Sequence, residues 1–493
     1  AELQRLREWP GLLRAYTGGA GMAKTALAVC GSGPGGYVAA IRAAQLGADV
    51  TLVEKARMGG TCLNVGCLPT KALLPSAHVF HEAGSSAAIG VEAAPRLDWE
   101  KVQLRRKSVV ERLVSGVEGL MRANRMRGAA GEASFLDAHR LKILGAEGEQ
   151  ALSFDACIIA AGSAPAMPPI PGLLEAGCID SAQALELDRV PASLLVLGGG
   201  VIGVELATAY HRFGAKVTIV EMADHILPNM EQSLTARLER ELRSSGVEVM
   251  TKSRVIRAAV QDGVPACLVE HGGREEWRKA EKLLVCTGRK AVFAGLHLEK
   301  AGVRFGRAIE ADSHMRTNIP HIYAVGDCNG QLMLAHAASE QGMIAAENCM
   351  GADVTFDASL CPSGVYSSPE LAGVGLTEKQ AREQGIACRT AAFPAAANGR
   401  SLILQQESGV VKVVVGEQYG ELLGVHICGA QATELIAEAA LALKLEATAE
   451  ELAGTIHPHP TLSECLREAA LAAMDRAVHI SGRQREEEET TAS

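Results

Sequence analysis

Aromatic side chains are scarce in this chain, and there is no excess of positive charge. Phe, Trp and Tyr together make up 3% of the 493 residues, so few rings are available to stack on the bases of a single-stranded nucleic acid. The formal net charge is −9, which disfavours non-specific attraction to a phosphate backbone. We therefore expect no nucleic-acid partner.

Long apolar runs and a dense cysteine framework are also missing. No unbroken hydrophobic stretch is long enough to cross a bilayer, so no membrane partner is expected. The 13 cysteines are an odd number scattered along a long chain, a pattern typical of a reducing compartment with most thiols free. We interpret the protein as soluble and cytoplasmic, with the mitochondrial matrix as the alternative.

The two ends of the chain carry no catalytic signal. Residues 1–22 are interpreted as an extension or linker, because Pro10 would break a helix and the few arginines are offset by glutamates. Residues 481–493 contain a run of four glutamates and are expected to form a solvated acidic tail.

The chain does contain glycine-rich turns in a nucleotide-binding context. The apolar run 26–30 leads into such a turn, and a helix and a second strand then end at Glu54. In this β-α-β pattern one glycine makes the tight turn, the next lets the backbone approach a pyrophosphate, and the last allows close helix–strand packing. These glycines are Gly31, Gly33 and Gly36. The pyrophosphate is expected at the helix N-terminus, and Glu54 is placed to bind a ribose.

The same plan recurs after the apolar run 194–197. Its glycines are Gly198, Gly200 and Gly203, and its second strand ends at Glu221. The spacing from the first glycine to the glutamate is 23 positions in both copies. One such motif is weak evidence, because glycine turns also arise for structural reasons. Two copies with matched spacing predict two bound dinucleotides.

Glu221 indicates which dinucleotide the second copy binds. A carboxylate at this position repels the extra phosphate of NADP and accepts a hydrogen bond from a free ribose hydroxyl. No basic cluster follows it, since the next residues are Met222, Ala223 and Asp224. The alternative, an ordinary surface glutamate at a strand end, leaves the repeated spacing unexplained. We therefore predict NAD rather than NADP.

Cys62 and Cys67 lie five positions apart, shortly after the first nucleotide motif. Cα atoms with this spacing are roughly 8.7 Å apart in a regular helix, whereas a disulfide needs about 4.4–6.8 Å. A bond between them would require a distorted backbone, which Gly66 permits. A redox disulfide is our interpretation. Unpaired thiols or metal ligands remain the alternatives, although His78 and His81 do not complete a recognisable zinc set. No metal is expected.

Two later segments carry candidate functional residues, an aspartate in one and a histidine with a glutamate in the other. A short strand ends at Asp327, which by itself is an ordinary strand-end acid. Near the C-terminus, Glu464 follows His459 by five positions. A carboxylate bonded to one ring nitrogen would fix the tautomer and raise the basicity of the other nitrogen. A lone histidine is more often structural than catalytic, and we interpret His457 as structural.

Taken together, these motifs resemble the flavin-dependent pyridine nucleotide–disulfide oxidoreductases, over about residues 24–478. The resemblance implies that Cys62 and Cys67 form the redox disulfide, with Cys62 exchanging with the substrate. It also implies that Asp327 bonds the ribityl chain of FAD and that His459, oriented by Glu464, is the acid–base residue.

Further residues are assigned by the same resemblance. Lys71 and Glu205 correspond to a pair beside the reactive face of the flavin. Gly288 lies in the matching stretch 286–289 and is expected among the cofactor-binding residues. One departure is Cys328, a thiol directly after the flavin-binding aspartate, for which the sequence offers no interpretation.

The resemblance also implies the architecture. We expect an α/β fold with two Rossmann-like dinucleotide-binding domains, for FAD and NAD, plus a C-terminal α+β dimerisation domain. The predicted ranges are 23–150 for the FAD domain, 151–282 for the NAD domain, 283–354 for a second FAD-domain or central segment, and 355–480 for dimerisation. The active site would be shared between the subunits of an obligate homodimer.

Within the family the chain is most similar to the members that oxidise dihydrolipoamide. The implied reaction converts dihydrolipoamide on a lipoyl domain to lipoamide and reduces NAD+ to NADH, with docking on a 2-oxo acid dehydrogenase or glycine-cleavage complex. The alternative is a related NAD(P)H-dependent reductase of another disulfide, which Glu221 and Asp224 disfavour. A mercuric reductase would lack His459, and a non-catalytic binding module would not need both cysteines.

Overall fold

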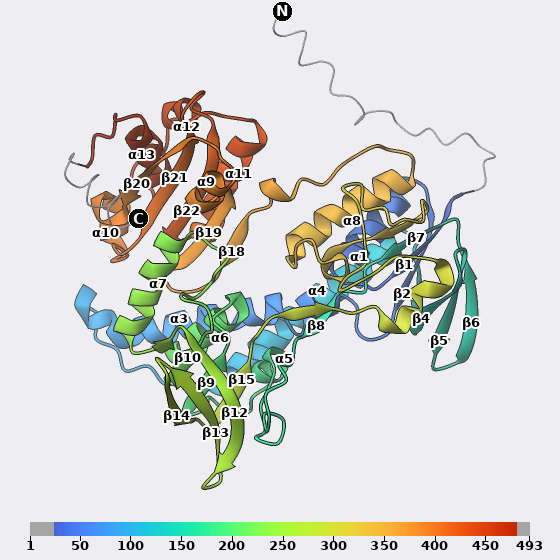
Figure 1. The fold of residues 1–493 in the computed structure, drawn as a ribbon, viewed down its shortest axis with the longest axis horizontal. Helices are drawn as coiled ribbons and strands as arrows, with labels where there is room; N and C mark the ends of the chain where they lie inside the picture. The colour runs from blue at the N-terminus through green and yellow to red at the C-terminus, as the bar shows by residue number, and fades with distance from the viewer. Residues whose placement is uncertain (1–23, 481–493) are drawn as a thin grey trace, which may run out of the picture. The chain divides into compact units, whose positions relative to one another are not determined.

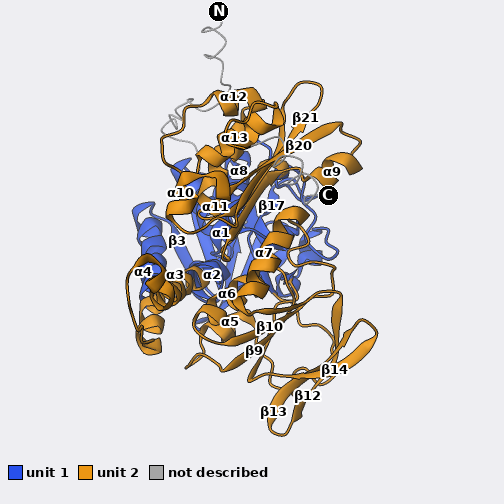
Figure 2. Ribbon diagram, turned by 90° about the vertical axis from the view of Figure 1, so that its left-hand side faces the viewer, with its two compact units in different colours: residues 1–68, 108–164, 289–358 blue, residues 69–107, 165–288, 359–493 orange. Residues whose placement is uncertain are grey.

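The computed structural model describes residues 24–480, so the predicted extension and acidic tail lie outside the described residues. The chain divides into two compact units, each assembled from separate segments (Figure 2). Unit 1 contains the described residues up to 68 together with 108–164 and 289–358. Unit 2 contains 69–107, 165–288 and the described residues from 359 onward. The domain boundaries given above stay predictions.

Unit 1 is built around a five-stranded parallel sheet with the strand order β17-β7-β1-β2-β3. Three of its strands, β7, β1 and β2, are labelled in Figure 1. Helices α1 and α8 pack against each other beside it, and a three-stranded antiparallel sheet, β4-β5-β6, completes the unit. The bounds are β1 Ala26–Cys30, α1 Pro34–Gln45, β2 Asp49–Glu54, β3 Arg127–Ala130, β4 Glu132–Asp137, β5 Arg140–Gly145, β6 Gly148–Ser153, β7 Ala156–Ile159, β17 Ile322–Ala324 and α8 Ala335–Cys349.

Strand β1 shows why the sheet of unit 1 is buried on both faces. Leu27 and Val29 pack into the cluster that contains the alanines of α1 and α8. Ala28 and Cys30 point the other way, into the cluster that contains Phe135 of β4. Successive side chains alternate between the faces of a strand, so a parallel strand covered on both sides requires a continuous apolar run.

Unit 2 begins with a four-stranded parallel sheet, β11-β10-β9-β15, and an antiparallel sheet, β12-β13-β14. The tight apolar cluster between the parallel strands, α6 and α7 is its core. The bounds are β9 Ser193–Leu197, α6 Val201–Arg212, β10 Lys216–Val220, α7 Gln232–Ser245, β11 Glu248–Met250, β12 Ser253–Gln261, β13 Val264–His271, β14 Arg274–Lys279 and β15 Lys282–Val285.

The C-terminal part of unit 2 is a five-stranded antiparallel sheet, β18-β19-β22-β21-β20, with helices packed on it (Figure 1). Every residue of β21 is buried. The bounds are β18 Ser363–Val365, β19 Glu370–Gly375, α9 Glu378–Glu383, β20 Cys388–Pro394, α10 Gly399–Ile403, β21 Val410–Gly416, β22 Leu422–Gly429, α11 Ala432–Lys444, α12 Ala449–Gly454 and α13 Glu464–Ala473.

Three helices carry or connect residues discussed below, namely α2 Gly60–Asn64, α3 Cys67–Ser85 and α4 Trp99–Ala123. The short elements α5 Ser181–Leu185, β8 Ser163–Pro165 and β16 Arg289–Ala291 complete the set of helices and strands. None of the described helices is long and apolar enough to cross a membrane. Two parallel nucleotide-binding sheets and an antiparallel C-terminal sheet with helices confirm the predicted fold class.

Candidate active site

The first glycine-rich turn connects β1 to α1 and has no room for side chains at two of its three glycines. A Cβ at Gly31 would overlap the carbonyl oxygen of Ala160, and the residue has φ +103°, which favours glycine. A Cβ at Gly36 would overlap the carbonyl oxygen of Gly31. Gly33, at the N-cap of α1, is different because a Cβ there would meet no atom within 4 Å. The open space at the helix N-terminus fits a phosphate group.

The second turn, between β9 and α6, repeats this geometry. A Cβ at Gly198 would overlap the carbonyl oxygen of Cys286, and one at Gly203 would overlap the carbonyl oxygen of Gly198. Gly200 is the N-cap of α6 and again has no atom within 4 Å of an added Cβ. The residues present therefore fit two dinucleotides, each with its pyrophosphate at a helix N-terminus.

The strand-end glutamates hold these turns in place. Glu54 accepts hydrogen bonds from the backbone N–H of Ser32 at 2.9 Å and from its hydroxyl at 2.6 Å. Glu221 accepts from the backbone N–H of Gly199 at 2.6 Å and from that of Ala223 at 2.8 Å. Two carboxylate oxygens offer about four acceptor positions, so both side chains keep capacity for ribose hydroxyls. Ser32 was not among the predicted residues.

The two cysteines flank a break between helices. Cys62 lies in α2, and Cys67 is the first residue of α3. The helix stops at Val65, and a Cβ at Gly66 would stand 3.0 Å from the carbonyl oxygen of Thr61. Gly66 therefore allows its backbone to lie close to the Thr61 carbonyl oxygen. Among residues 24–480, no group of three or more His, Cys, Asp or Glu side chains is arranged to hold a metal ion.

Lys71 and Glu205 form a close ion pair in unit 2. The Lys71 Nζ is 2.6 Å from Glu205 Oε2, and the Glu205 side chain is only 3% exposed. The other carboxylate oxygen accepts a hydrogen bond from the backbone N–H of Tyr366 at 3.0 Å, and the Lys71 Nζ is 4.8 Å from the centre of the Tyr366 ring. The two predicted residues are thus together, and Tyr366 is an unpredicted third member. Their role beside a flavin stays a prediction.

Asp327 belongs to a polar cluster in unit 1. Its carboxylate accepts a hydrogen bond from the hydroxyl of Ser163 and lies 3.8 Å from Arg289 Nε. Arg289 also donates to the Ser163 hydroxyl at 2.7 Å and to the Ser163 carbonyl oxygen at 2.8 Å. Sequence reasoning found the aspartate and missed both partners. The only available signal was that Arg289 ends the matching stretch that contains Gly288.

Cys328 has a structural explanation. Its thiol is fully buried and donates hydrogen bonds to the carbonyl oxygens of Ile159 and Val325. Burial raises the pKa of this thiol to about 11. The thiol therefore stays protonated near neutral pH and behaves as a small buried hydrophobe rather than a nucleophile. Gly288 lies in unit 2, where its carbonyl oxygen accepts a hydrogen bond from the Ala166 N–H at 2.9 Å.

The two histidines near the C-terminus have opposite environments. His457 is 4% exposed, and its ring nitrogens lie 2.7 Å from Glu438 and 3.0 Å from the Thr455 carbonyl oxygen. His459 is 80% exposed, and its Nδ1 lies 2.9 Å from Glu464 Oε1. Within the described part of the chain, no group hydrogen-bonds to its Nε2. His459 is therefore held at one nitrogen and presents the other outward.

Glu464 is held ready to orient the His459 ring. Partial burial opposes its ionisation, but the Thr461 N–H, at 2.8 Å, and the bonded His459 ring outweigh burial and lower the pKa of the carboxyl. Glu464 is thus ionised at neutral pH and accepts a hydrogen bond from the Nδ1–H of His459. This arrangement leaves Nε2 as the basic nitrogen.

Comparisons with known proteins place these features in a family. The family model described as pyridine nucleotide-disulphide oxidoreductase matches residues 25–342, and the model of its dimerisation domain matches 361–470. The chain belongs to the pyridine nucleotide–disulphide oxidoreductase family. The oxidoreductase class, the cofactors FAD and NAD, and the homodimer predicted from the sequence are therefore confirmed.

Individual relatives show which enzymes of this family the chain is similar to. The chain is 42% identical to dihydrolipoyl dehydrogenase from Bacillus subtilis over 92% of this chain and 99% of the relative. It is 44% identical to dihydrolipoyl dehydrogenase from Thermus scotoductus over 93% and 99% of the two chains. The solved structure of LpdA from Mycobacterium tuberculosis is 27% identical, with a TM-score of 0.84 and coverage of 90% and 99%. The chain is thus similar to dihydrolipoyl dehydrogenases over nearly its whole length, as the sequence motifs predicted.

Proposed function

We propose that this protein oxidises protein-bound dihydrolipoamide to lipoamide and reduces NAD+ to NADH, with release of one proton. The observation that carries the proposal is the exposed His459, whose ring is fixed by an ionised Glu464 while Nε2 points outward. A disulfide exchange that begins with a substrate thiol needs such a base, because only the thiolate attacks a disulfide.

The side chains of this protein account for the thiol chemistry. His459 Nε2 takes the proton from one substrate thiol, and the thiolate attacks the Cys62 sulfur of a Cys62–Cys67 disulfide. Cys67 leaves as a thiolate, and a mixed disulfide joins Cys62 to the substrate. The second substrate thiol passes its proton to the departing Cys62 sulfur as it attacks the substrate sulfur of the mixed disulfide, which closes the lipoamide ring and leaves Cys62 as a thiol. The enzyme is left with two reduced cysteines.

FAD, when bound, supplies the path by which the electron pair reaches NAD+. The residues proposed to hold FAD are Gly31, Gly33, Gly36 and Asp327. The residues proposed to hold NAD+ are Gly198, Gly200, Gly203, Glu221 and Gly288. The support is the matched turn geometry of the two modules. In the homodimer, we assign His459 to act on the cysteine pair of the other subunit.

The physiological setting follows from the substrate. Lipoamide is carried on a lipoyl domain of a larger assembly, so we propose docking on a 2-oxo acid dehydrogenase or glycine-cleavage complex. The scattered cysteines favour a reducing compartment, for which the cytoplasm is our assignment. Size-exclusion chromatography tests the docking. The wild-type chain is run in a cytoplasmic lysate, once with its lipoylated partners present and once without them.

The decisive experiment mixes the purified flavoprotein with dihydrolipoamide and NAD+ and follows NADH formation. Turnover with NAD+ and little with NADP+ is expected. His459→Gln should lower kcat by about 10²–10⁴-fold, since that is the usual contribution of a general base. A yellow, dimeric protein that forms no NADH with dihydrolipoamide would refute the substrate assignment. Other disulfides, supplied with NADH or NADPH, would then be assayed as substrates.

A further inference from the structure

A buried lysine joins the NAD module of unit 2 to its C-terminal sheet. Lys412, on β21, is 1% exposed, and its Nζ lies 3.0 Å from Glu231 Oε1 and 2.7 Å from Glu378 Oε2. Glu231 precedes α7 of the NAD module, whereas Glu378 begins α9 of the C-terminal part. We call Lys412, Glu231 and Glu378 the Lys412 anchor. A buried charge is costly unless it is paired, so the three groups hold one another.

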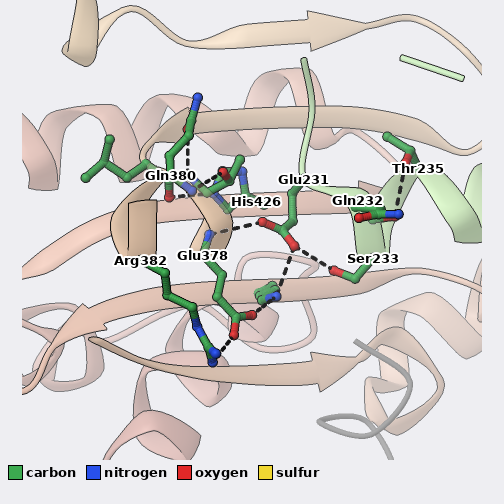
Figure 3. A network of polar contacts seen from close by, with 11 residues as sticks. Glu231, Gln232, Ser233, Thr235, Glu378, Gln380, Arg382 and His426 are labelled. Carbon is green, nitrogen blue, oxygen red and sulfur yellow. Dashed lines mark hydrogen bonds and ion pairs between the residues drawn. The ribbon is translucent and has the colours of Figure 1, made fainter. Parts of the chain in front are cut away.

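Additional hydrogen bonds fix Glu231 (Figure 3). Its Oε2 accepts the backbone N–H of Glu378 at 3.2 Å, and its Oε1 accepts the hydroxyl of Ser233 at 3.1 Å. Glu378 is in turn paired with Arg382 at 2.5 Å. Because Glu231 bonds both a side chain and a main-chain amide from the C-terminal part, its position is set in more than one direction.

The ionisation of Glu231 contributes to the Lys412 anchor, in addition to the hydrogen-bond geometry. Burial by itself opposes ionisation of Glu231, but Lys412 and the hydrogen bonds outweigh burial and lower the pKa of this carboxyl. Burial lowers the pKa of His426, whose Nε2 lies 3.0 Å from the Leu376 carbonyl oxygen, so its ring is neutral. Glu231 is therefore ionised within the anchor at neutral pH.

The anchor is connected to the NAD-binding turn by a short stretch of chain. Residues 222–230, which we call the second return segment, run from Glu221 to Glu231. Leu227 within it is 2% exposed and donates its N–H to the carbonyl oxygen of Gly199 at 2.9 Å. The N–H of Gly199 is the group that bonds Glu221. The second return segment thus hydrogen-bonds to the carbonyl oxygen of the same residue, Gly199, whose N–H bonds Glu221.

Leu227 also adopts an unusual backbone conformation. Its φ is +53°, in the left-handed region that non-glycine residues rarely adopt. Such a conformation persists only when surrounding contacts enforce it, and it is typical of functional sites. Here the enforcing contacts are the hydrogen bond to Gly199 on one side and the fixed Glu231 on the other.

We infer that Lys412 and Glu231 are positioning residues for NAD+: Lys412, from the C-terminal part of unit 2, fixes Glu231, and Glu231 holds the second return segment, and through it the Gly199–Glu221 contact, in the binding geometry. This inference rests on the proposed NAD+-linked reaction. Neither side chain contacts the nucleotide in this scheme. Both act through Leu227 and the glycine turn.

The test measures NAD+ binding and unfolding separately. In the FAD-loaded homodimer, Lys412→Met is expected to raise the Kd for NAD+ by about tenfold. Titration calorimetry with NAD+ alone measures this Kd. KM for NAD+ should rise in parallel, while KM for dihydrolipoamide and flavin content stay unchanged. Lys379→Met is the matched control, because Lys379 lies in α9 nearby but is 79% exposed.

A double variant separates positioning from mere stability. Glu231→Met with Lys412→Met removes both buried charges, which often restores stability because no unpaired charge remains. If the double variant melts like the wild type but still binds NAD+ about tenfold more weakly, the inference is supported. If any folded variant lacking Lys412 binds NAD+ within about twofold of the wild type, the anchor is only structural and the inference fails.

Failure of the proposed function would look different. If the wild type binds NAD+ but does not oxidise dihydrolipoamide, the substrate assignment is lost. The Kd values with NAD+ alone would still decide whether Lys412 positions the NAD-binding turn.

Discussion

The two glycine-rich modules share one turn geometry and differ in the chain that follows the strand-end glutamate. In both, the outer glycines have no room for a Cβ and the middle glycine opens to a helix N-terminus. In both, the glutamate bonds the amide just after the first glycine. Phosphate binding therefore depends on local backbone geometry, which is the same in each module. The specific chemistry of each module depends on its return segment, the stretch of chain that follows the glutamate.

The return segments differ in both backbone and charge. The first, residues 55–60, places the Gly59 N–H 3.1 Å from the Ser32 hydroxyl oxygen and leads directly into α2 with Cys62. Its Arg57 pairs with Glu111 at the surface, with both side chains about half exposed. The second return segment uses a leucine with positive φ and ends at the buried Lys412 anchor. The first segment leads into the helix that carries Cys62, and the second is fixed by a lysine from another part of its unit.

The largest expected effect comes from breaking the buried anchor. Lys412→Met leaves the carboxylate of Glu231 buried without its cation, so the free energy of unfolding should fall by about 3–5 kcal/mol. Denaturant titration of the holoprotein measures it. A loss below about 1 kcal/mol would mean that Glu231 finds water or another partner.

Overfilling the tight glycine positions should have the next largest effect and should separate the modules. Gly36→Ala and Gly203→Ala each force a methyl group onto a carbonyl oxygen, which costs about 1–3 kcal/mol. Gly36→Ala should yield protein that has lost flavin, whereas Gly203→Ala should stay yellow and lose NAD+ binding. Absorbance of the purified variants and NAD+ calorimetry check this. Loss of the same cofactor in both would contradict the assignment of the modules.

Substitution at the open glycines should weaken binding without loss of stability. Gly33→Ala and Gly200→Ala add a methyl group where no protein atom lies within 4 Å. We expect at least about tenfold weaker binding of FAD in the first and of NAD+ in the second, equivalent to about 1.4 kcal/mol. Gly116→Ala in α4, which also has open space around its Cβ, is the control. Unchanged affinities would place the phosphates elsewhere.

The effect of Lys412→Met should depend on pH. In the folded wild type the pKa of Glu231 is lowered, so the stabilisation from its ionised form is present above the ordinary glutamate pKa and is lost as pH falls through the lowered value. Without the lysine, burial raises the pKa of Glu231, and protonation relieves the unpaired charge. The loss in free energy of unfolding that Lys412→Met causes should therefore be smaller at pH 4 than at pH 7, by about 1 kcal/mol. A deficit independent of pH would point to lost packing.

The smallest effect is expected at the surface pair of the first return segment. Arg57→Met should change the free energy of unfolding by only about 0–1 kcal/mol, because exposed ion pairs are weak and screened by salt. Thermal unfolding with and without added salt measures it. A loss as large as that of Lys412→Met would remove the contrast between the two return segments.

Much of the candidate site was predictable because its signals are local. The glycine spacing, the strand-end glutamates and the break between Cys62 and Cys67 depend on residues within about one β-α-β unit. The family resemblance added Lys71 with Glu205 and His459 with Glu464, and the structure places each pair within hydrogen-bonding distance. The fold class followed from the same repeats.

Other features could not be predicted because their partners are distant in sequence. Ser163 contacts Asp327 from 164 positions earlier in the chain, and Arg289 lies 38 positions before Asp327. Tyr366 meets Glu205 from 161 positions away. Cys328 could be interpreted only once its burial was known, since burial is what raises its pKa.

Local sequence was enough to predict the two glycine-rich turns, the acids that follow them and the backbone break between Cys62 and Cys67, because short-range backbone geometry dictates which residue types such turns accept. Only the tertiary structure decided that Lys412 pairs with Glu231, 181 positions earlier, and that His459 is exposed while His457 is buried. The physical reason is that burial and the pairing of charges depend on which segments pack together, and no local pattern specifies that.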